Sequence, residues 1–179
     1  TRIEECLKNG VLNKISVLPN SDALDFKRRL LGENVKLSLH LNLIEGYPLS
    51  KKEDVSLIVS DKGFFKYSFI GLFFLSIFGN RSLLEKQLYN EIKMQIDFWK
   101  KEMGEETPIL VDSHQHTHMI PLVFKTLMRV IKEENVEVEY IRIPAEPILP
   151  YIKSPSLYFK FRPIGLIKQW LLKFLKFVN

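Results

Sequence analysis

The sequence predicts an α/β domain with parallel strands, and two observations lead to this prediction. Segments with strand-like patterns alternate with segments of helical periodicity along most of the chain. The length of 179 residues and the 46% hydrophobic content are enough for one sizeable core. Because strands separated by helices usually pair in parallel, the order strand, helix, strand, helix, strand, helix, strand indicates a parallel sheet covered by helices.

Four segments have the pattern of strands. The clearest is the run 35–43 (VKLSLHLNL), in which apolar and polar residues alternate. This alternation places His40 and Asn42 on one face and the leucines on the other. The other three strands are expected at residues 11–18, 109–111 and 136–143.

Three helices are predicted between these strands, the first of them a short one at residues 22–31. From Leu83 to Met103 apolar residues recur every three or four positions, and Ser82 is the candidate N-cap. The third helix begins at Pro121. Its expected inward-facing residues are Leu122, Phe124, Leu127, Met128 and Ile131.

Two apolar segments need a separate interpretation. Residues 64–78 are shorter than the about twenty residues of a membrane span, so a buried or interfacial helix is expected there. Residues 164–178 combine a wide apolar face with a narrow polar stripe, which fits a helix packed on the domain or one lying on a membrane surface. We therefore expect a domain at residues 1–150 and a basic amphipathic helical segment at residues 151–179.

The distribution of charge argues against a nucleic-acid-binding protein. The formal net charge is +5, but residues 151–179 contain six lysines and arginines and no acidic residue, so the first 150 residues carry about −1. A nucleic-acid site normally spreads basic and aromatic residues over one face of a domain. The single cysteine, Cys6, excludes an internal disulfide framework and favours the cytoplasm.

All four histidines lie in two places, one at His40 and three within residues 112–118 (DSHQHTH). Neutral imidazole is a common ligand for zinc and related metals, and it can also act as a general acid or base. Both places follow apolar strand cores, so both should lie at the carboxyl ends of strands, where α/β folds assemble their sites. The pattern predicts part of a metal-dependent hydrolase site, with His40 and His114 as neighbours.

The partners of His114 within its own cluster stay open. A strand that continues past Ser113 would place His114 and His116 on one side, whereas a helical turn would bring His114 and His118 together. Asp112 has three open roles: a metal ligand, a residue that orients an imidazole, or a turn former.

Residues 39–49 (LHLNLIEGYPL) and 112–118 resemble the two central motifs of the YdjC-like carbohydrate deacetylases, which include the chitooligosaccharide deacetylases. The helix at 83–100 and the segment 141–146 (IRIPAE) match the family in position and character, so the resemblance covers residues 1 to 146. It implies a deformed (β/α) barrel, incomplete in this chain, that removes acetyl groups from N-acetylated sugars or oligosaccharides.

The resemblance also implies a set of site residues. By motif position, His40 and His114 would bind a divalent metal, magnesium or zinc, together with an aspartate. His116 or His118 would line the sugar pocket or tune the metal. Weaker substrate-binding candidates are Asn42, Arg142 and Glu146.

Two family motifs have no counterpart in the sequence. The family's first strand carries an Asp-Asp-Phe-Gly motif that supplies the third metal ligand and the base, and the resemblance places this motif before Thr1. A late His-Pro motif, whose histidine would serve in acid–base catalysis, is also not found. The resemblance therefore implies two metal ligands within residues 1–179 and leaves the catalytic residue unassigned.

Three functions remain under consideration. The first is a metal-dependent deacetylase acting on a carbohydrate. The second is a degenerate homologue that binds a glycan or glycolipid without turning it over, held at a membrane by the apolar run and the basic tail. The third keeps the metal but cleaves a phosphoester or another amide, because histidines alone do not specify the bond. A homo-oligomer and attachment to a membrane surface stay open as well.

Overall fold

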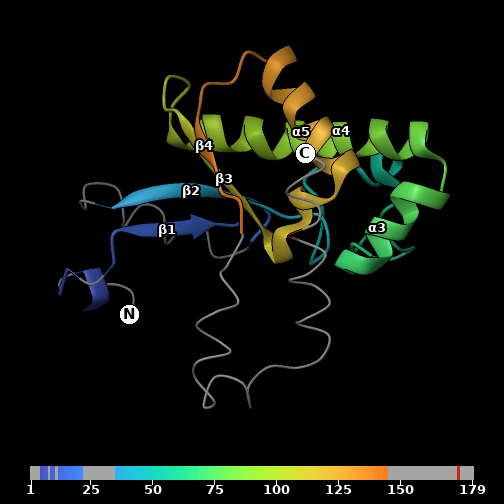
Figure 1. Ribbon diagram of the computed structural model, residues 1–179, viewed down its shortest axis with the longest axis horizontal. Coiled ribbons are helices and arrows are strands. Elements are labelled where there is room, and N and C mark those ends of the chain that lie inside the picture. Colours follow the sequence, from blue (N-terminus) through green and yellow to red (C-terminus); the bar gives the residue numbers. More distant parts are fainter. Residues whose placement is uncertain (1–4, 8, 11, 22–34, 145–172, 174–179) are drawn as a thin grey trace.

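The computed structural model describes residues 5–7, 9–10, 12–21, 35–144 and 173. Its four strands are all parallel and lie in the order in which they occur in the sequence (Figure 1). They are β1 (Lys14–Val17), β2 (Lys36–Leu41), β3 (Ile109–Ser113) and β4 (Val138–Ile141). Sequential parallel strands with intervening helices form an arc of the kind that a (β/α) barrel closes. The α/β prediction is confirmed.

Apart from the helical residues 5–7 and 173, the described helices follow the second and third strands. They are α3 (Phe69–Phe78), α4 (Arg81–Met103) and α5 (Pro121–Glu133), with short 3-10 segments η1 (Lys52–Val55) and η2 (His114–Met119). Figure 1 shows α4 and α5 side by side, and these two helices are in contact. In the same view α3 lies at the opposite end of the molecule from β1.

The core forms where the leucine face of β2 meets α4. Leu39 and Leu41 are fully buried, as the period-two pattern predicts. The apolar stripe of α4 packs into the same core through Leu84, Leu88, Ile92, Ile96 and Trp99. The opposite face of the sheet carries the polar residues of the alternating pattern, which makes that face the location of the candidate site.

Two details of the helices differ from the sequence prediction. The N-cap of α4 is Asn80, whose side-chain oxygen accepts from the Leu83 N–H at 3.1 Å, so the assignment to Ser82 was wrong. Met128 is 43% exposed, because α5 instead turns Val123, Thr126 and Val130 toward the core. The expected helices at 22–31 and 164–178 and the division at residue 150 lie outside the described residues and stay predictions.

Helix α3 occupies residues Phe69–Phe78 of the apolar run at 64–78, and it is partly buried and partly exposed. It begins at the N-cap Ser68, whose hydroxyl accepts from the Gly71 N–H, and it buries Phe69 and Leu72. No helix among the described residues combines the length and the apolar character that crossing a bilayer requires.

A row of buried polar side chains on α4 holds the segment that follows β2. Gln87, Glu91 and Gln95 are spaced four residues apart and therefore lie on one side of the helix. Gln95 accepts from the Asn42 N–H at 2.9 Å and donates to the Asn42 carbonyl at 2.6 Å. The side chain of Gln87 accepts from the Leu57 N–H at 2.7 Å. Each contact satisfies a backbone group that would otherwise be buried without a partner.

Glu91 is the centre of this row and is fully buried. Its carboxylate accepts from the backbone N–H groups of Leu49 at 3.0 Å and Ser50 at 2.9 Å. It also accepts from Nε2 of Gln95 at 2.8 Å. Three N–H donors compensate for removing this charge from water.

We expect Glu91→Gln to lower the free energy of unfolding by about 2–3 kcal/mol, because one amide N–H₂ would face backbone donors that need an acceptor. Urea denaturation measures this loss. The control is Asp97→Asn on the same helix, which breaks only a surface pair with Lys93 at 3.3 Å and should cost about 0.5 kcal/mol or less. Equal losses in the two variants would contradict the role given to Glu91.

Candidate functional site

The first part of the site is a histidine held by a buried carboxylate across two strands. The register of the sheet pairs His40 of β2 with Asp112 of β3. Nδ1 of His40 lies 2.5 Å from Oδ1 of Asp112. An ionised carboxylate can only accept, so His40 donates through Nδ1–H and its Nε2 carries the lone pair in the neutral ring. Of the three open roles of Asp112, the geometry matches the one that orients an imidazole.

Asp112 is tied to β1 as well. Its second oxygen, Oδ2, accepts from the hydroxyl of Ser16 at 2.6 Å, and the Ser16 oxygen lies 3.0 Å from that of Ser38. Burial alone would raise the pKa of Asp112, but the hydrogen bonds from His40 and Ser16 and the nearby charge of Lys14 outweigh it and lower this pKa. Both oxygens are therefore occupied, and the carboxylate stays ionised.

His114 follows β3 directly and stands next to His40, as predicted. The two ring centroids are 5.6 Å apart and the ring planes meet at 74°. Nε2 of His114 lies 2.6 Å from Oε2 of Glu45, a carboxylate on the loop after β2. This buried nitrogen nevertheless makes no contact with hydrogen-bond geometry among the described residues. The Glu45 side chain is 72% exposed, so the pair lies near the protein surface.

The chain then makes an unusual left-handed turn. Gln115 has φ 50° and His116 has φ 64°, values that residues with a Cβ rarely adopt. Such backbone conformations are concentrated at functional sites. The chain therefore follows neither a continuous strand nor a continuous helix through the three clustered histidines.

His118 is held by hydrogen bonds at both of its ring nitrogens. It is fully buried, and its Nε2 donates to the Arg142 carbonyl at 2.7 Å. The Ser113 hydroxyl donates to Nδ1 of His118 at 2.5 Å, and its oxygen accepts from the His118 N–H at 3.0 Å. Burial lowers the pKa of His118. With both ring nitrogens engaged, this histidine attaches η2 to β3 and β4.

The weaker substrate-binding candidates have different positions. Asn42 is buried; it donates to Asn20 at 3.1 Å and to the Glu45 carbonyl at 2.7 Å. Its oxygen accepts from the N–H groups of Ile44 and Glu45. These four bonds shape the loop that carries Glu45 and leave no donor of Asn42 for a sugar. The Arg142 side chain is exposed, and Glu146 lies outside the described residues.

The histidine pair fits part of a metal site. His40 is oriented by a carboxylate, which is the usual arrangement around a metal-ligating imidazole, and the buried Nε2 of His114 lacks a proper hydrogen bond. Within the part of the chain that the structure describes, no three His, Cys, Asp or Glu side chains converge closely enough to hold a metal. The two histidines could therefore supply two ligands and need at least one more.

The expected third ligand and base has no position in this structure. The resemblance places that aspartate before Thr1, and Thr1 itself lies outside the described residues. The assignment of the catalytic residue to a position ahead of Thr1 therefore stays a prediction. Among the described residues, the acidic side chains that contact the histidine pair are Asp112 and Glu45, and the sequence motifs did not assign Glu45 to the site.

Sequence comparison identifies the family. The family model described as YdjC-like protein matches residues 2–171 of the chain. The chain belongs to the YdjC-like family. A carbohydrate deacetylase from Danio rerio is 28% identical over 153 residues, which are 83% of this YdjC-like chain and 46% of the relative. A carbohydrate deacetylase from Clostridium beijerinckii is 28% identical over 159 residues, covering 86% and 59%.

A chitooligosaccharide deacetylase from Citrobacter koseri is 26% identical over 149 residues, covering 82% of the YdjC-like chain and 54% of the relative. The chain thus spans about half the length of the curated relatives it matches. A solved structure from Enterococcus faecalis V583, provisionally named a cellobiose-phosphate cleavage protein, superposes with a TM-score of 0.62. It is 20% identical and covers 89% of this chain and 58% of its own, which supports the fold.

Sequence reasoning missed two parts of this site. Glu45 lies inside the first motif, but nothing in the sequence indicates that it contacts His114, since the contact joins residues about seventy positions apart. The polar row on α4 had a signal: Gln87, Glu91 and Gln95 recur every four residues at the border of the apolar stripe.

We expect acid to destabilise the protein through His118. Its folded pKa is lowered, so the unfolded chain binds a proton at the ordinary value of 6.5 while the folded chain resists it. The free energy of unfolding should therefore fall as the pH drops below 6.5 toward the folded pKa. His118→Gln should remove this slope, as measured by urea denaturation between pH 7 and pH 5. Asp112 titrates below this window because its pKa is lowered; an unchanged slope in the variant would contradict the assignment.

Gln115→Gly should leave the free energy of unfolding within about 0.5 kcal/mol of the parent value or raise it. Glycine relieves a left-handed conformation that costs roughly 1 kcal/mol, which offsets the greater flexibility of the unfolded chain. The control Lys125→Gly, at an exposed position inside α5, should lose about 1 kcal/mol. Similar losses at the two positions would show that the turn at Gln115 is not strained.

Proposed function

We propose that this YdjC-like chain carries the central part of a metal-dependent carbohydrate deacetylase site. The contact network of His40 and His114 at the carboxyl ends of β2 and β3 is the observation that supports this proposal. The names of the similar proteins, carbohydrate deacetylase and chitooligosaccharide deacetylase, supply the substrate class: an N-acetylated sugar or oligosaccharide.

In this proposal the strands provide the ligands in fixed orientation. Asp112 keeps the proton of His40 on Nδ1 and so directs the lone pair of Nε2 away from the sheet. His114 presents Nε2 beside it. A divalent cation held by both nitrogens would supply Lewis acidity to the amide carbonyl and to the attacking water. Zinc suits imidazole, while magnesium would require more oxygen ligands.

Glu45 is the described carboxylate best placed to accept a proton from the attacking water. Its Oε2 lies 2.6 Å from Nε2 of His114, and its side chain is 72% exposed, so a metal on that nitrogen would displace the carboxylate toward the attacking water. Asp112, the other described carboxylate in contact with the histidine pair, has both oxygens engaged by His40 and Ser16. Hydrolysis also needs an acid for the leaving amine, a role for which His116 in the adjacent turn is the nearest candidate in the sequence.

The proposal is tested by metal analysis together with acetate release from N-acetylated chitooligosaccharides. His40→Ala and His114→Ala should each lower bound metal at least about tenfold and abolish acetate release. Glu45→Gln should keep the metal and slow acetate release by about 10²-fold or more, the range for a lost general base. The control Glu137→Gln, at an exposed position on the segment before β4, should change neither quantity.

Each result separates the functions considered. Metal content that is unchanged in His114→Ala would remove the ligand assignment. Metal binding without acetate release from any N-acetylated sugar would instead indicate a homologue that binds glycans without turning them over. Full activity in Glu45→Gln would show that Glu45 is not the general base.

A further inference from the structure

Helix α3 exposes an apolar face that nothing among the described residues covers. Ile70, Phe74, Ile77 and Phe78 are 47%, 52%, 53% and 79% exposed. They recur at positions i, i+4, i+7 and i+8 and so form one continuous stripe. The rings of Phe74 and Phe78 stack with centroids 6.1 Å apart. Contiguous apolar surface of this kind usually marks an interaction site.

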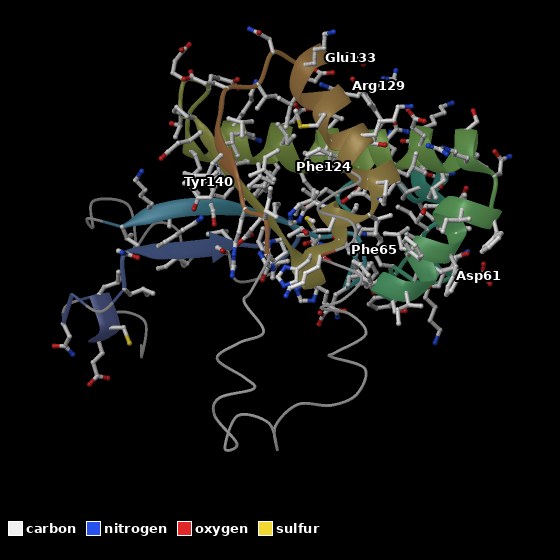
Figure 2. The ribbon with its side chains drawn as sticks, in the orientation of Figure 1. Asp61, Phe65, Phe124, Arg129, Glu133 and Tyr140 are labelled. Carbon is white, nitrogen blue, oxygen red and sulfur yellow. The ribbon has the colours of Figure 1, made fainter. Side chains whose placement is uncertain are left out.

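The apolar surface continues from α3 toward the candidate active site. Phe64 is 39% exposed and packs on Tyr47, with ring centroids 4.0 Å apart. The next residue, Phe65, donates its N–H to the Gly46 carbonyl at 2.9 Å, and Gly46 follows Glu45 directly. Helix α3 also contacts η2, the histidine segment. Figure 2 shows Phe65 beside α3, on the side of the molecule where η2 lies.

Basic residues flank both ends of this surface. Lys62 and Lys66 precede α3 and Arg81 follows it, and all three are exposed. Residues 62–84 contain no acidic residue. The nearest acidic residues in the sequence are Asp61 and Glu85, and Glu85 is already paired with Lys125 at 3.4 Å and Arg129 at 3.8 Å. An apolar helical face between cations has the composition of a helix that lies on an anionic membrane surface.

We propose that the exposed face of α3 docks on an anionic lipid bilayer surface. Ile70, Phe74, Ile77 and Phe78 enter the boundary between headgroups and acyl chains, and Lys62, Lys66 and Arg81 contact the lipid phosphates. The ten-residue helix lies in the plane of the surface, since it is too short to span it. Docking there brings the loop of Glu45 and the histidine segment close to the headgroups.

Charge disfavours two other possible occupants of this face, a second copy of the chain and the C-terminal segment 151–179. A second copy would pair the face with itself, and because both ends of α3 are basic, either orientation of the two helices would oppose cations. Four exposed side chains on one short helix are also far fewer than the about 20–30 residues a side of a standard protein interface. The C-terminal segment 151–179 carries six basic residues and no acidic one, so it too would bring like charge to the face.

Vesicle flotation with the purified protein tests the proposal. Vesicles of phosphatidylcholine and phosphatidylglycerol in equal amounts should bind it, and vesicles of phosphatidylcholine alone should bind it much more weakly. Phe74→Ser with Phe78→Ser should reduce binding to the anionic vesicles by roughly tenfold or more, because two exposed rings no longer leave water. Lys66→Glu with Arg81→Glu should reduce it about thirtyfold, from about 1 kcal/mol for each basic side chain.

Two control variants make comparable changes outside α3. Met94→Ser with Met128→Ser removes two exposed apolar side chains from α4 and α5, and Lys101→Glu with Lys132→Glu reverses two exposed charges there. Both controls should bind within about twofold of the parent, since the substituted residues lie outside the docking face. The substituted positions of all four variants are exposed, and circular dichroism confirms that each variant is folded.

Two results would overturn the proposal. The first is equal vesicle binding by the parent and by the Phe74 and Phe78 variant, which would move any membrane contact away from α3. The second is absence of vesicle binding together with a dimer in sedimentation that the same variant dissociates, which would make a second copy the occupant. Neither measurement requires catalysis, so failure of the deacetylase proposal leaves this one standing and failure here leaves that one standing.

Discussion

The carboxylate of Asp112 is the constraint on which the candidate site depends. A charge buried inside a sheet costs several kcal/mol unless hydrogen-bonded partners surround it. Asp112 obtains them from Ser16 of β1 and His40 of β2, so one side chain of β3 ties three strands together. The same bonds fix the tautomer of His40. The position of the His40 nitrogen therefore depends on the register of the sheet. A shift of the register would separate His40 from Asp112 and leave the buried carboxylate without this partner.

The backbone of the loop after β2 is held by a second set of buried polar side chains, the row on α4. Buried backbone N–H groups must find acceptors, and a loop next to a core finds few within itself. Gln95 of α4 accepts from the N–H of Asn42 at the start of the loop, and Glu91 accepts from the N–H groups of Leu49 and Ser50 near its end. The side chain of Asn42 donates to the Glu45 carbonyl within the turn between them. The exposed side chain of Glu45 is therefore carried by a backbone whose hydrogen bonds are satisfied.

Local burial explains what the sequence could predict. The alternation at 35–43 and the periodicity at 83–103 arise because one side of each element faces the core, so strands, helices and their parallel order were foreseeable, as was the proximity of His40 and His114. The role of Asp112 depends on which residue of β2 lies opposite it, and no local pattern contains that register. The left-handed turn had no signal either, since Gln115 and His116 replace the glycine or asparagine that usually marks positive φ. Without the turn, the direction of His118 into the core could not be deduced.

The sequence of α3 shows a related limit, and the structure gives it a physical meaning. A helix that is apolar all round is normally buried on every side, because each uncovered side leaves apolar area in water. Here α4 and η2 cover only part of the helix, and the ends of the uncovered face are basic. Because α3 is apolar on all sides, its sequence does not indicate which side faces the core. The cations at its ends are complementary to an anionic surface. The polar, hydrogen-bonded face of the sheet and the apolar face of α3 meet at the loop of Glu45, where the ring of Tyr47 stacks on Phe64.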